Sequence, residues 1–179
     1  YFSNDWFSNI KTKMKSKRIF FQNKKILIYG YGKTGKSAFN FLKKKNYLKV
    51  FDDNLQLTNL PYKVRFSKGR DRVNNFDYIL ISPGINYKKC SLSNEIINNK
   101  KKIITDLDVF YKSFPKNFFV TITGTNGKST TCKLLHQAFK SQGIHSKLVG
   151  NIGKSILSNY QFTKKTLFVV EASSYQIEY

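Results

Sequence analysis

Short apolar runs alternate with longer amphipathic stretches along this chain, and glycine, proline or small polar residues separate them. The runs have the length of buried strands, and the stretches repeat their apolar residues at helical spacing. We expect strands at 24–29, 47–51, 77–82, 103–105, 118–122, 145–149 and 166–170, and helices at 36–44, 92–99 and 128–141. Strands that alternate with helices predict an α/β protein built on parallel sheets.

The pattern divides the chain into three parts. Residues 1–21 form a basic extension, residues 22–113 form a small Rossmann-like, doubly wound domain, and residues 114–179 begin a second α/β domain of the P-loop type. Ser113-Phe114-Pro115-Lys116 is the expected linker between the two domains. The apolar positions that set the helical spacing are Ala38, Phe39 and Leu42 in the first domain and Leu134, Leu135, Ala138 and Phe139 in the second.

A complete glycine-rich turn, Gly30-Tyr31-Gly32-Lys33-Thr34-Gly35, follows the first expected strand. Its glycines let the chain turn tightly, let a phosphate approach the backbone and let the next helix pack close to the strand. The second strand ends in Asp52-Asp53, about twenty residues later, where an acid meets a ribose in dinucleotide-binding folds. By themselves these features predict an NAD or FAD site with Asp52 as the ligand contact. A glycine turn without a ligand and an Asx-type turn explain the same residues.

Three further candidate positions follow expected strands. They are Ser82-Pro83-Gly84, Gly150-Asn151-Ile152-Gly153 and Glu171. In open parallel sheets, ligands collect at the carboxyl edge of the strands. A carboxylate at that edge, beside a phosphate-binding loop, is well placed to hold Mg²⁺, so Glu171 is a candidate metal ligand. Plain turns and a surface ion pair are the alternatives.

The segment Thr121-Ile122-Thr123-Gly124-Thr125-Asn126-Gly127-Lys128-Ser129-Thr130 stands between an expected strand and an expected helix. A glycine-rich turn in that position directs backbone N–H groups and the positive end of the helix dipole at one point, which stabilises an anion. Lys128 can reach the β and γ phosphates of a nucleoside triphosphate, and the Ser129 hydroxyl can hold the bridging Mg²⁺. The spacing is G-x-x-G-K-S, whereas the standard loop would place a glycine at Ile122. A simple helix-capping turn is the alternative.

The charge balance is extreme, with 32 Lys and Arg residues against 10 Asp and Glu and a formal net charge of +22. Such a charge attracts anions of any kind, including nucleic acids and nucleotides. The lysines are scattered over the whole chain, and it has no recognition-helix or basic-aromatic RNA motif, so we expect no nucleic-acid partner. Abundant Lys, Asn, Ile, Phe and Tyr are typical of a coding sequence rich in A and T.

Cysteine, histidine and hydropathy add little further chemistry. Cys90 and Cys132 have no metal-ligand spacing, which fits a reducing compartment, and His136 and His145 lie outside any motif and are interpreted as structural. No apolar stretch approaches the ~20 residues of a membrane span, and residues 1–23 lack a signal-peptide core. We therefore expect a cytoplasmic protein without membrane insertion, and a monomer.

Together, four blocks of the sequence resemble the Mur ligase family, in the order in which the family carries them. They are Gly30-Tyr31-Gly32-Lys33-Thr34-Gly35-Lys36-Ser37, Ser82-Pro83-Gly84-Ile85, Thr121 to Thr130, and Gly150-Asn151-Ile152-Gly153 with Glu171 to Glu178. The resemblance spans residues 22–179. The phosphate loop is typical of the superfamily, and Glu-Ala-Ser-Ser-Tyr-Gln-Ile-Glu after Gly-Asn-Ile-Gly is similar to its D-glutamate-adding branch.

The resemblance implies that the first domain holds the UDP part of a UDP-muramoyl substrate in place of a nicotinamide cofactor. Where family members can carry Thr-Arg after the acid, this chain has Asp53-Asn54, which removes a cation. The substrate-binding residues that it implies are Lys33, Thr34, Asp52, Ser82, Pro83 and Gly84, with Asn151, Ser173 and Gln176 at the muramoyl-alanine end. The residues that it implies for ATP are Gly124, Thr125, Asn126, Gly127, Lys128, Ser129 and Thr130, with Lys128 catalytic and with Ser129 and Glu171 as Mg²⁺ ligands.

The implied reaction is ATP-dependent amide formation in peptidoglycan precursor synthesis. It would join UDP-N-acetylmuramoyl-L-alanine and D-glutamate through an acyl phosphate, with catalysis mainly by alignment and charge neutralisation. The family also uses a later carbamylated lysine, a later metal-binding histidine and a C-terminal domain, so we expect the 179 residues alone to be inactive. The alternatives are an NAD-dependent oxidoreductase, which leaves Gly127-Lys128-Ser129 without a role, a nucleic-acid-binding module, and another ligase of the superfamily such as a folylpolyglutamate synthase.

Overall fold

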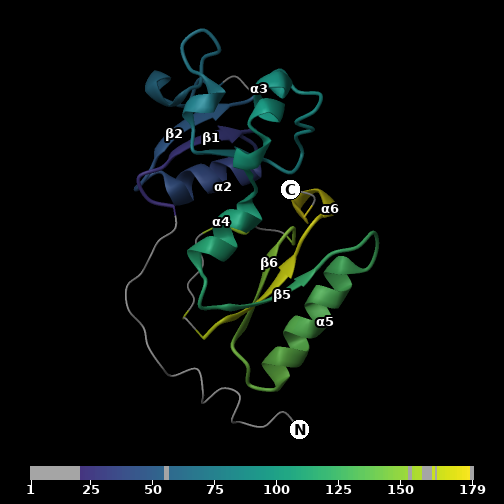
Figure 1. The fold of residues 1–179 in the computed structure, drawn as a ribbon. Helices are drawn as coiled ribbons and strands as arrows, with labels where there is room; N and C mark the ends of the chain where they lie inside the picture. Colours follow the sequence, from purple (N-terminus) through teal and green to yellow (C-terminus); the bar gives the residue numbers. More distant parts are fainter. Residues whose placement is uncertain (1–20, 55–56, 153–154, 159–162, 164, 178–179) are drawn as a thin grey trace.

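The computed structural model describes residues 21–54, 57–152, 155–158, 163 and 165–177, and it contains two parallel β-sheets (Figure 1). The first sheet has the strand order β2-β1-β3-β4, and the second has the order β5-β7-β6. All the paired strands in both sheets are parallel. The molecule is therefore of the α/β class, as the alternation of apolar runs predicts. The expected extension at 1–21 lies outside the described residues except for Phe21.

All seven expected strands form. Their bounds are β1 Lys25–Tyr29, β2 Tyr47–Phe51, β3 Tyr78–Ile81, β4 Ile103–Ile104, β5 Phe118–Ile122, β6 Ser146–Gly150 and β7 Leu167–Glu171. The interior strands β1, β3 and β7 are buried along most of their length, which explains why their sequences are continuous apolar runs. Strands β6 and β7 each begin and end one residue later than expected, so Gly150 and Glu171 are the last residues of their strands.

Five α-helices connect or flank the strands in the described residues. They are α2 Lys33–Leu42, α3 Ser93–Asn98, α4 Asp106–Ser113, α5 Lys128–Ser141 and α6 Ser174–Ile177. The expectation that the first of these begins at residue 36 is wrong, because α2 begins at Lys33 and includes Gly35 in its first turn. A Cβ atom at Gly35 would lie 1.9 Å from the carbonyl oxygen of Gly30, so this glycine lets the helix start directly against the loop. Among the described residues, no helix is long and apolar enough to cross a membrane.

Helix α4 was not expected from the pattern of apolar residues. It follows β4 and begins with a capping box, in which the Thr105 backbone N–H donates to Asp108 Oδ2 (2.8 Å) and the Asp108 N–H donates to Thr105 Oγ1 (3.4 Å). A threonine followed three residues later by an acid, before an apolar run, is a helix-start signal that could have predicted α4. The expected linker therefore begins at the last residue of a helix.

The hydrophobic core is continuous from one sheet to the other through α4, which lies between them in Figure 1. Phe110 on α4 is 1% exposed, and its ring centroid lies 5.1 Å from that of Phe114, 5.7 Å from that of Phe119 and 4.9 Å from that of Phe168. Edge-to-face aromatic contacts of this kind are favourable. The expected domain boundary between residues 113 and 114 leaves one sheet on each side. Because the two sheets share this core, the division into two domains stays a prediction.

Helix α5 packs on the second sheet through only some of its apolar residues. Cys132 is fully buried, and Leu135 and Phe139 are partly buried, whereas Leu134 is 60% exposed and Ala138 is also exposed. Residues three and four apart share one helix face, so the packed face is that of Cys132. The predicted helix is confirmed from its first to its last residue, but Leu134 and Ala138 lie outside its packed face.

Candidate functional site

The first glycine turn joins β1 to α2 at the carboxyl edge of the first sheet, and its three glycines have different surroundings. Gly30 has φ +91°, and a Cβ there would lie 2.9 Å from the Ser82 Cβ. Gly35 allows the close approach of α2 described above. A Cβ at Gly32 would have no neighbour within 4 Å, so the backbone is open to a ligand at that point. Lys33 and Thr34 form the first turn of α2, which lacks a side-chain cap and an acidic residue. This arrangement suits an anion.

The two acids after β2 have different partners. Asp52 accepts hydrogen bonds from the Tyr31 backbone N–H (2.6 Å) and from the Asn54 N–H (2.9 Å). The second of these forms the Asx-type turn considered as an alternative, while the first fixes the glycine turn. Asp53 instead accepts from the hydroxyl groups of Tyr29 and Ser91. Burial acts to raise the pKa of Asp53, but these hydrogen bonds outweigh burial and the pKa is lowered.

The turn after β3 is fastened to the glycine turn. The Ser82 Oγ donates to the Gly30 carbonyl oxygen at 2.9 Å, and the Ile85 N–H donates to the Ser82 carbonyl oxygen at 2.9 Å. Ser82 is 9% exposed, Pro83 is half-buried, and Gly84 is exposed, with no neighbour within 4 Å of the place where a Cβ would stand. The structure therefore brings the predicted residues of the first domain to one edge of the first sheet.

The second glycine turn joins β5 to α5 and is exposed to solvent. Gly124 has φ +146° and Gly127, the N-cap of α5, has φ +75°, which are conformations that favour glycine. The Lys128 ammonium donates to the carbonyl oxygens of Gly124 (2.7 Å) and Thr125 (3.2 Å). The cation is thus held over the turn, at the N-terminus of a helix, where phosphate groups are stabilised. The remaining predicted residues of this turn, Asn126, Ser129 and Thr130, are also exposed.

Ser129 and Glu171 meet although 42 residues separate them. The Ser129 Oγ donates to Glu171 Oε2 at 2.7 Å, and Glu171 is 4% exposed at the end of β7. Gly150 lets β6 approach here, because it has φ +105° and a Cβ would lie 2.2 Å from the Glu171 carbonyl oxygen. A hydroxyl and a carboxylate are the oxygen ligands that Mg²⁺ accepts. Among the described residues, no group of three or more His, Cys, Asp or Glu could hold a metal ion.

The end of β7 continues into a second group of predicted residues. The N–H and Oγ of Ser173 both donate to Gln176 Oε1, at 2.9 and 3.1 Å. The Gln176 Nε2 donates to Asp106 Oδ1 at 2.8 Å. Asn151 lies at the end of neighbouring β6, and its N–H donates to the Glu171 carbonyl oxygen at 3.0 Å. Sequence reasoning did not find Asp106, and no local pattern relates it to a partner 70 residues away. Gly153 and Glu178 of the same motifs lie outside the described residues.

The two histidines lie away from both glycine turns. The Nδ1 of His136 is 2.9 Å from the Ser146 Oγ, and the Nδ1 of His145 is 2.9 Å from the Thr166 Oγ1. These contacts join α5 to β6 and join the residue before β6 to the residue before β7. Burial and the nearby Lys140 lower the pKa of His136. Both side chains fit the structural interpretation.

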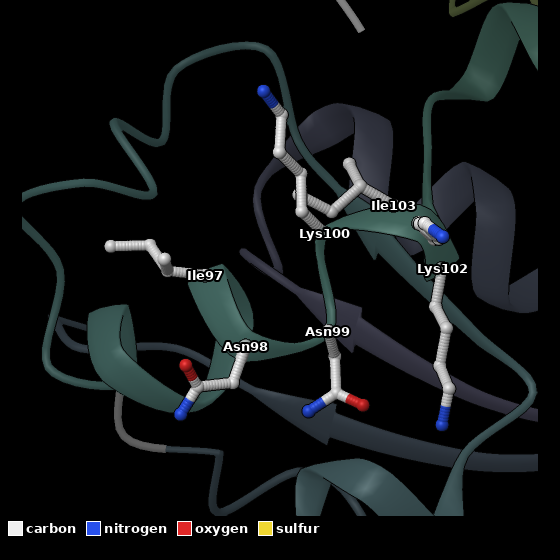
Figure 2. Close-up of a pocket in the computed structure, with 7 residues that line it drawn as sticks. Ile97, Asn98, Asn99, Lys100, Lys102 and Ile103 are labelled. Carbon is white, nitrogen blue, oxygen red and sulfur yellow. The ribbon is translucent and has the colours of Figure 1, made fainter.

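A hollow of about 740 Å³ lies away from the glycine turns and is lined by residues 97–103 (Figure 2). These residues run directly into β4, so they lie at the amino edge of the first sheet. Figure 2 shows Lys100 and Lys102 extending in opposite directions, and the Lys102 Nζ donates to the Asn74 carbonyl oxygen at 2.7 Å. These two lysines therefore do not converge on one anion. The hollow contributes no residue to either glycine turn.

Comparisons with known proteins match two separate regions of the chain. Residues 24–105 match the family model of the Mur ligase MurD-like N-terminal domain, and residues 122–179 match that of the Mur ligase middle domain. Three similar proteins are each named UDP-N-acetylmuramoylalanine–D-glutamate ligase. Identity is 35% over 164 residues for the protein of Rickettsia conorii, 33% over 168 for that of Rickettsia prowazekii and 37% over 169 for that of Francisella philomiragia.

These alignments cover 86%, 88% and 89% of this chain, but only 31%, 36% and 37% of the three relatives. The chain therefore spans about a third of the length of the curated relatives that it matches. The two family models together account for most of the described residues: the first matched region contains the whole first sheet, and the second contains β6, β7 and the last residue of β5. On these matches, the chain belongs to the Mur ligase family.

Proposed function

We propose that this chain carries the sugar-nucleotide site and the phosphate-binding part of the ATP site of a ligase that adds D-glutamate to UDP-N-acetylmuramoyl-L-alanine. The observation that carries the proposal is the pair of glycine turns at the carboxyl edges of two sheets, one of which leads into Lys128 and Ser129 beside Glu171. The names of the similar proteins supply the substrates. An NAD-dependent oxidoreductase would use only the first turn.

In the first site, the pyrophosphate of the UDP group would lie against the open backbone at Gly32 and the first turn of α2. Lys33 brings a positive charge there, and Thr34 brings a hydroxyl donor. Asp52 would accept from the nucleoside while it continues to hold the turn through the Tyr31 N–H. Ser82, Pro83 and Gly84 would form the opposite wall, because Ser82 fastens that turn to Gly30.

In the second site, the triphosphate of ATP would lie on the turn that contains Gly124, Thr125, Asn126 and Gly127. Lys128 would exchange its contacts with loop carbonyls for contacts with phosphate oxygens, and Thr130 would contribute a hydroxyl in the first turn of α5. Ser129 and Glu171 would hold Mg²⁺, since their oxygens already lie together. The metal would neutralise the charge that develops on the phosphate groups.

Asn151, Ser173 and Gln176 lie at the ends of β6 and β7, next to Glu171, where they would position the muramoyl-alanine end of the substrate. In that position the alanine carboxylate would lie near the γ-phosphate, and its attack on the phosphorus would give an acyl phosphate and release ADP. The amine of D-glutamate would then displace phosphate to form the amide. The chain's own contribution is alignment and charge neutralisation. The proposal includes a cytoplasmic location and a monomeric state.

Calorimetric titration of the 179-residue chain with UDP-N-acetylmuramoyl-L-alanine tests the first site, with NAD titrated in parallel. We expect binding of the sugar nucleotide at one site per chain and none of NAD. Binding of NAD alone would return the glycine turn to a dinucleotide cofactor and overturn the proposal. Circular dichroism of the same sample establishes that the chain is folded. A folded chain that binds neither ligand would also contradict the proposal.

A further inference from the structure

A buried carboxylate that takes no direct part in the proposed function contacts one of its residues. Asp106 is the first residue of α4 and is 3% exposed. Its Oδ1 accepts a hydrogen bond from Gln176 Nε2 at 2.8 Å, across the junction between α4 and α6. Burial raises the pKa of Asp106, and the hydrogen bond from Gln176 opposes this shift. A buried carboxylate is stabilised by hydrogen-bond donors, and Gln176 supplies the side-chain donor beside the backbone N–H groups of Asp106 and Leu107.

The hydrogen bonds of Gln176 fix which way its amide points. Its Oε1 accepts from the backbone N–H of Ser173 (2.9 Å), which can only donate, while its Nε2 faces an Asp106 oxygen. Rotating the amide by half a turn would place N–H against N–H and oxygen against oxygen, and both hydrogen bonds would be lost. Asp106 and Ser173 therefore hold the amide in one orientation from opposite sides.

Gln176 faces open space, whereas Asp106 does not. Gln176 lines a hollow of about 510 Å³ at the junction of α4, β5 and α6, together with Thr105, Tyr111 and Thr121, and Asp106 is not part of that lining. An amide nitrogen carries two protons, so one remains for a ligand when the other is bonded to Asp106. Any effect of Asp106 on a ligand must therefore act through Gln176.

We propose that Asp106 is a positioning residue for the sugar nucleotide: it orients the Gln176 amide, and through it Ser173, toward the muramoyl-alanine end. This inference rests on the proposed function, because it assumes that Gln176 contacts that end of the substrate. The inference also gives a role to the junction between the sheets. Asp106 lies on α4, which follows the first sheet, and Gln176 lies on α6, which follows the last strand of the second sheet.

The test compares UDP-N-acetylmuramoyl-L-alanine with UDP alone by calorimetry, because UDP reaches only the first glycine turn. We expect Asp106→Ala to weaken binding of the full sugar nucleotide by about 3- to 10-fold, the effect of one hydrogen bond, and to leave the affinity for UDP unchanged. Gln176→Ala should give the same loss, and the double variant no further loss. Val109→Ala is the matched control, since it removes buried volume from the same helix without touching the network, and it should leave both affinities unchanged.

The outcomes separate the inference from the proposed function. If the unaltered chain binds neither UDP nor the sugar nucleotide, the proposed function fails and the inference fails with it. If the unaltered chain binds both but Asp106→Ala weakens both equally, or neither, only the positioning role is overturned. Thermal unfolding gives a ligand-free check: the losses in Tm from Asp106→Ala and Gln176→Ala should be less than additive in the double variant, and additive losses would contradict the network.

Discussion

Gly35→Ala changes one hydrogen atom to a methyl group at the closest backbone approach of the first glycine turn. Gly35 lies in the first turn of α2, where its backbone is helical and alanine is intrinsically favoured. Its Cβ, however, would lie 1.9 Å from the Gly30 carbonyl oxygen, and this contact would have to open by about 1.5 Å to reach an ordinary separation. The same movement would pull Gly30 away from the Ser82 hydroxyl.

The expected cost follows from these contacts. Overpacking costs roughly 1–3 kcal/mol, and a lost buried hydrogen bond adds about 0.5–1.5 kcal/mol. The higher helix propensity of alanine offsets about 1 kcal/mol of this loss. We therefore expect the free energy of unfolding to fall by about 1–3 kcal/mol and the Tm by roughly 3–10 °C. Because the turn moves, affinity for the sugar nucleotide should fall by about 10- to 100-fold, while affinity for Mg²⁺ and ATP should not change.

Gly32→Ala is the matched control in the same motif. A Cβ at Gly32 meets no atom within 4 Å and the residue has φ −71°, so the loss of stability should stay below about 1 kcal/mol, the cost of alanine in place of glycine at a helix N-cap. The new methyl group would nevertheless stand where the phosphate approaches, and affinity for the sugar nucleotide should fall. Thermal unfolding and calorimetry together separate the two effects. A Gly35→Ala chain that unfolds at the unaltered temperature would refute the close approach of α2 to Gly30.

Two further substitutions test the second turn and the shared core. Lys128→Ala should weaken binding of ATP with Mg²⁺ by about 10- to 100-fold, because it removes a charge-assisted contact to phosphate, and should leave sugar-nucleotide binding unchanged in parallel calorimetry. Lys133→Ala, at an exposed position of the same helix, is its control, and an equal loss in both variants would contradict a specific role for Lys128. Phe110→Ala should cost about 3–5 kcal/mol in chemical denaturation, because its buried ring packs against Phe119 and Phe168 of the second sheet. A cost below about 1 kcal/mol would mean that α4 does not pack on the second sheet through Phe110.

Local pattern was sufficient for the strands and for both glycine turns. Apolar runs of strand length and the punctuation by glycine gave all seven strands to within about two residues at either end, and α5 to the residue. The meeting of Ser129 with Glu171 also follows from sequence, since the carboxyl ends of neighbouring parallel strands share one edge.

What local pattern missed depends on packing between distant segments. Leu134 is apolar yet exposed, because the position of α5 on the sheet, and not its composition, selects the buried stripe. Asp53 is engaged by Tyr29 and Ser91, which no spacing rule places beside it. Asp106 and Gln176 meet only because α4 packs between the sheets. Helix α4 is different, since its capping box was present in the sequence and could have predicted the helix.

Amide chemical-shift mapping on the ¹⁵N-labelled chain would distinguish the two nucleotide sites within one sample. UDP-N-acetylmuramoyl-L-alanine should shift the amides of residues 30–35 and of Ser82 and Gly84, and ATP with Mg²⁺ should shift those of residues 124–130, with either set appearing in the presence of the other ligand. Shifts by ATP with Mg²⁺ at residues 30–35, or by the sugar nucleotide at residues 124–130 alone, would contradict a chain with one site for each nucleotide.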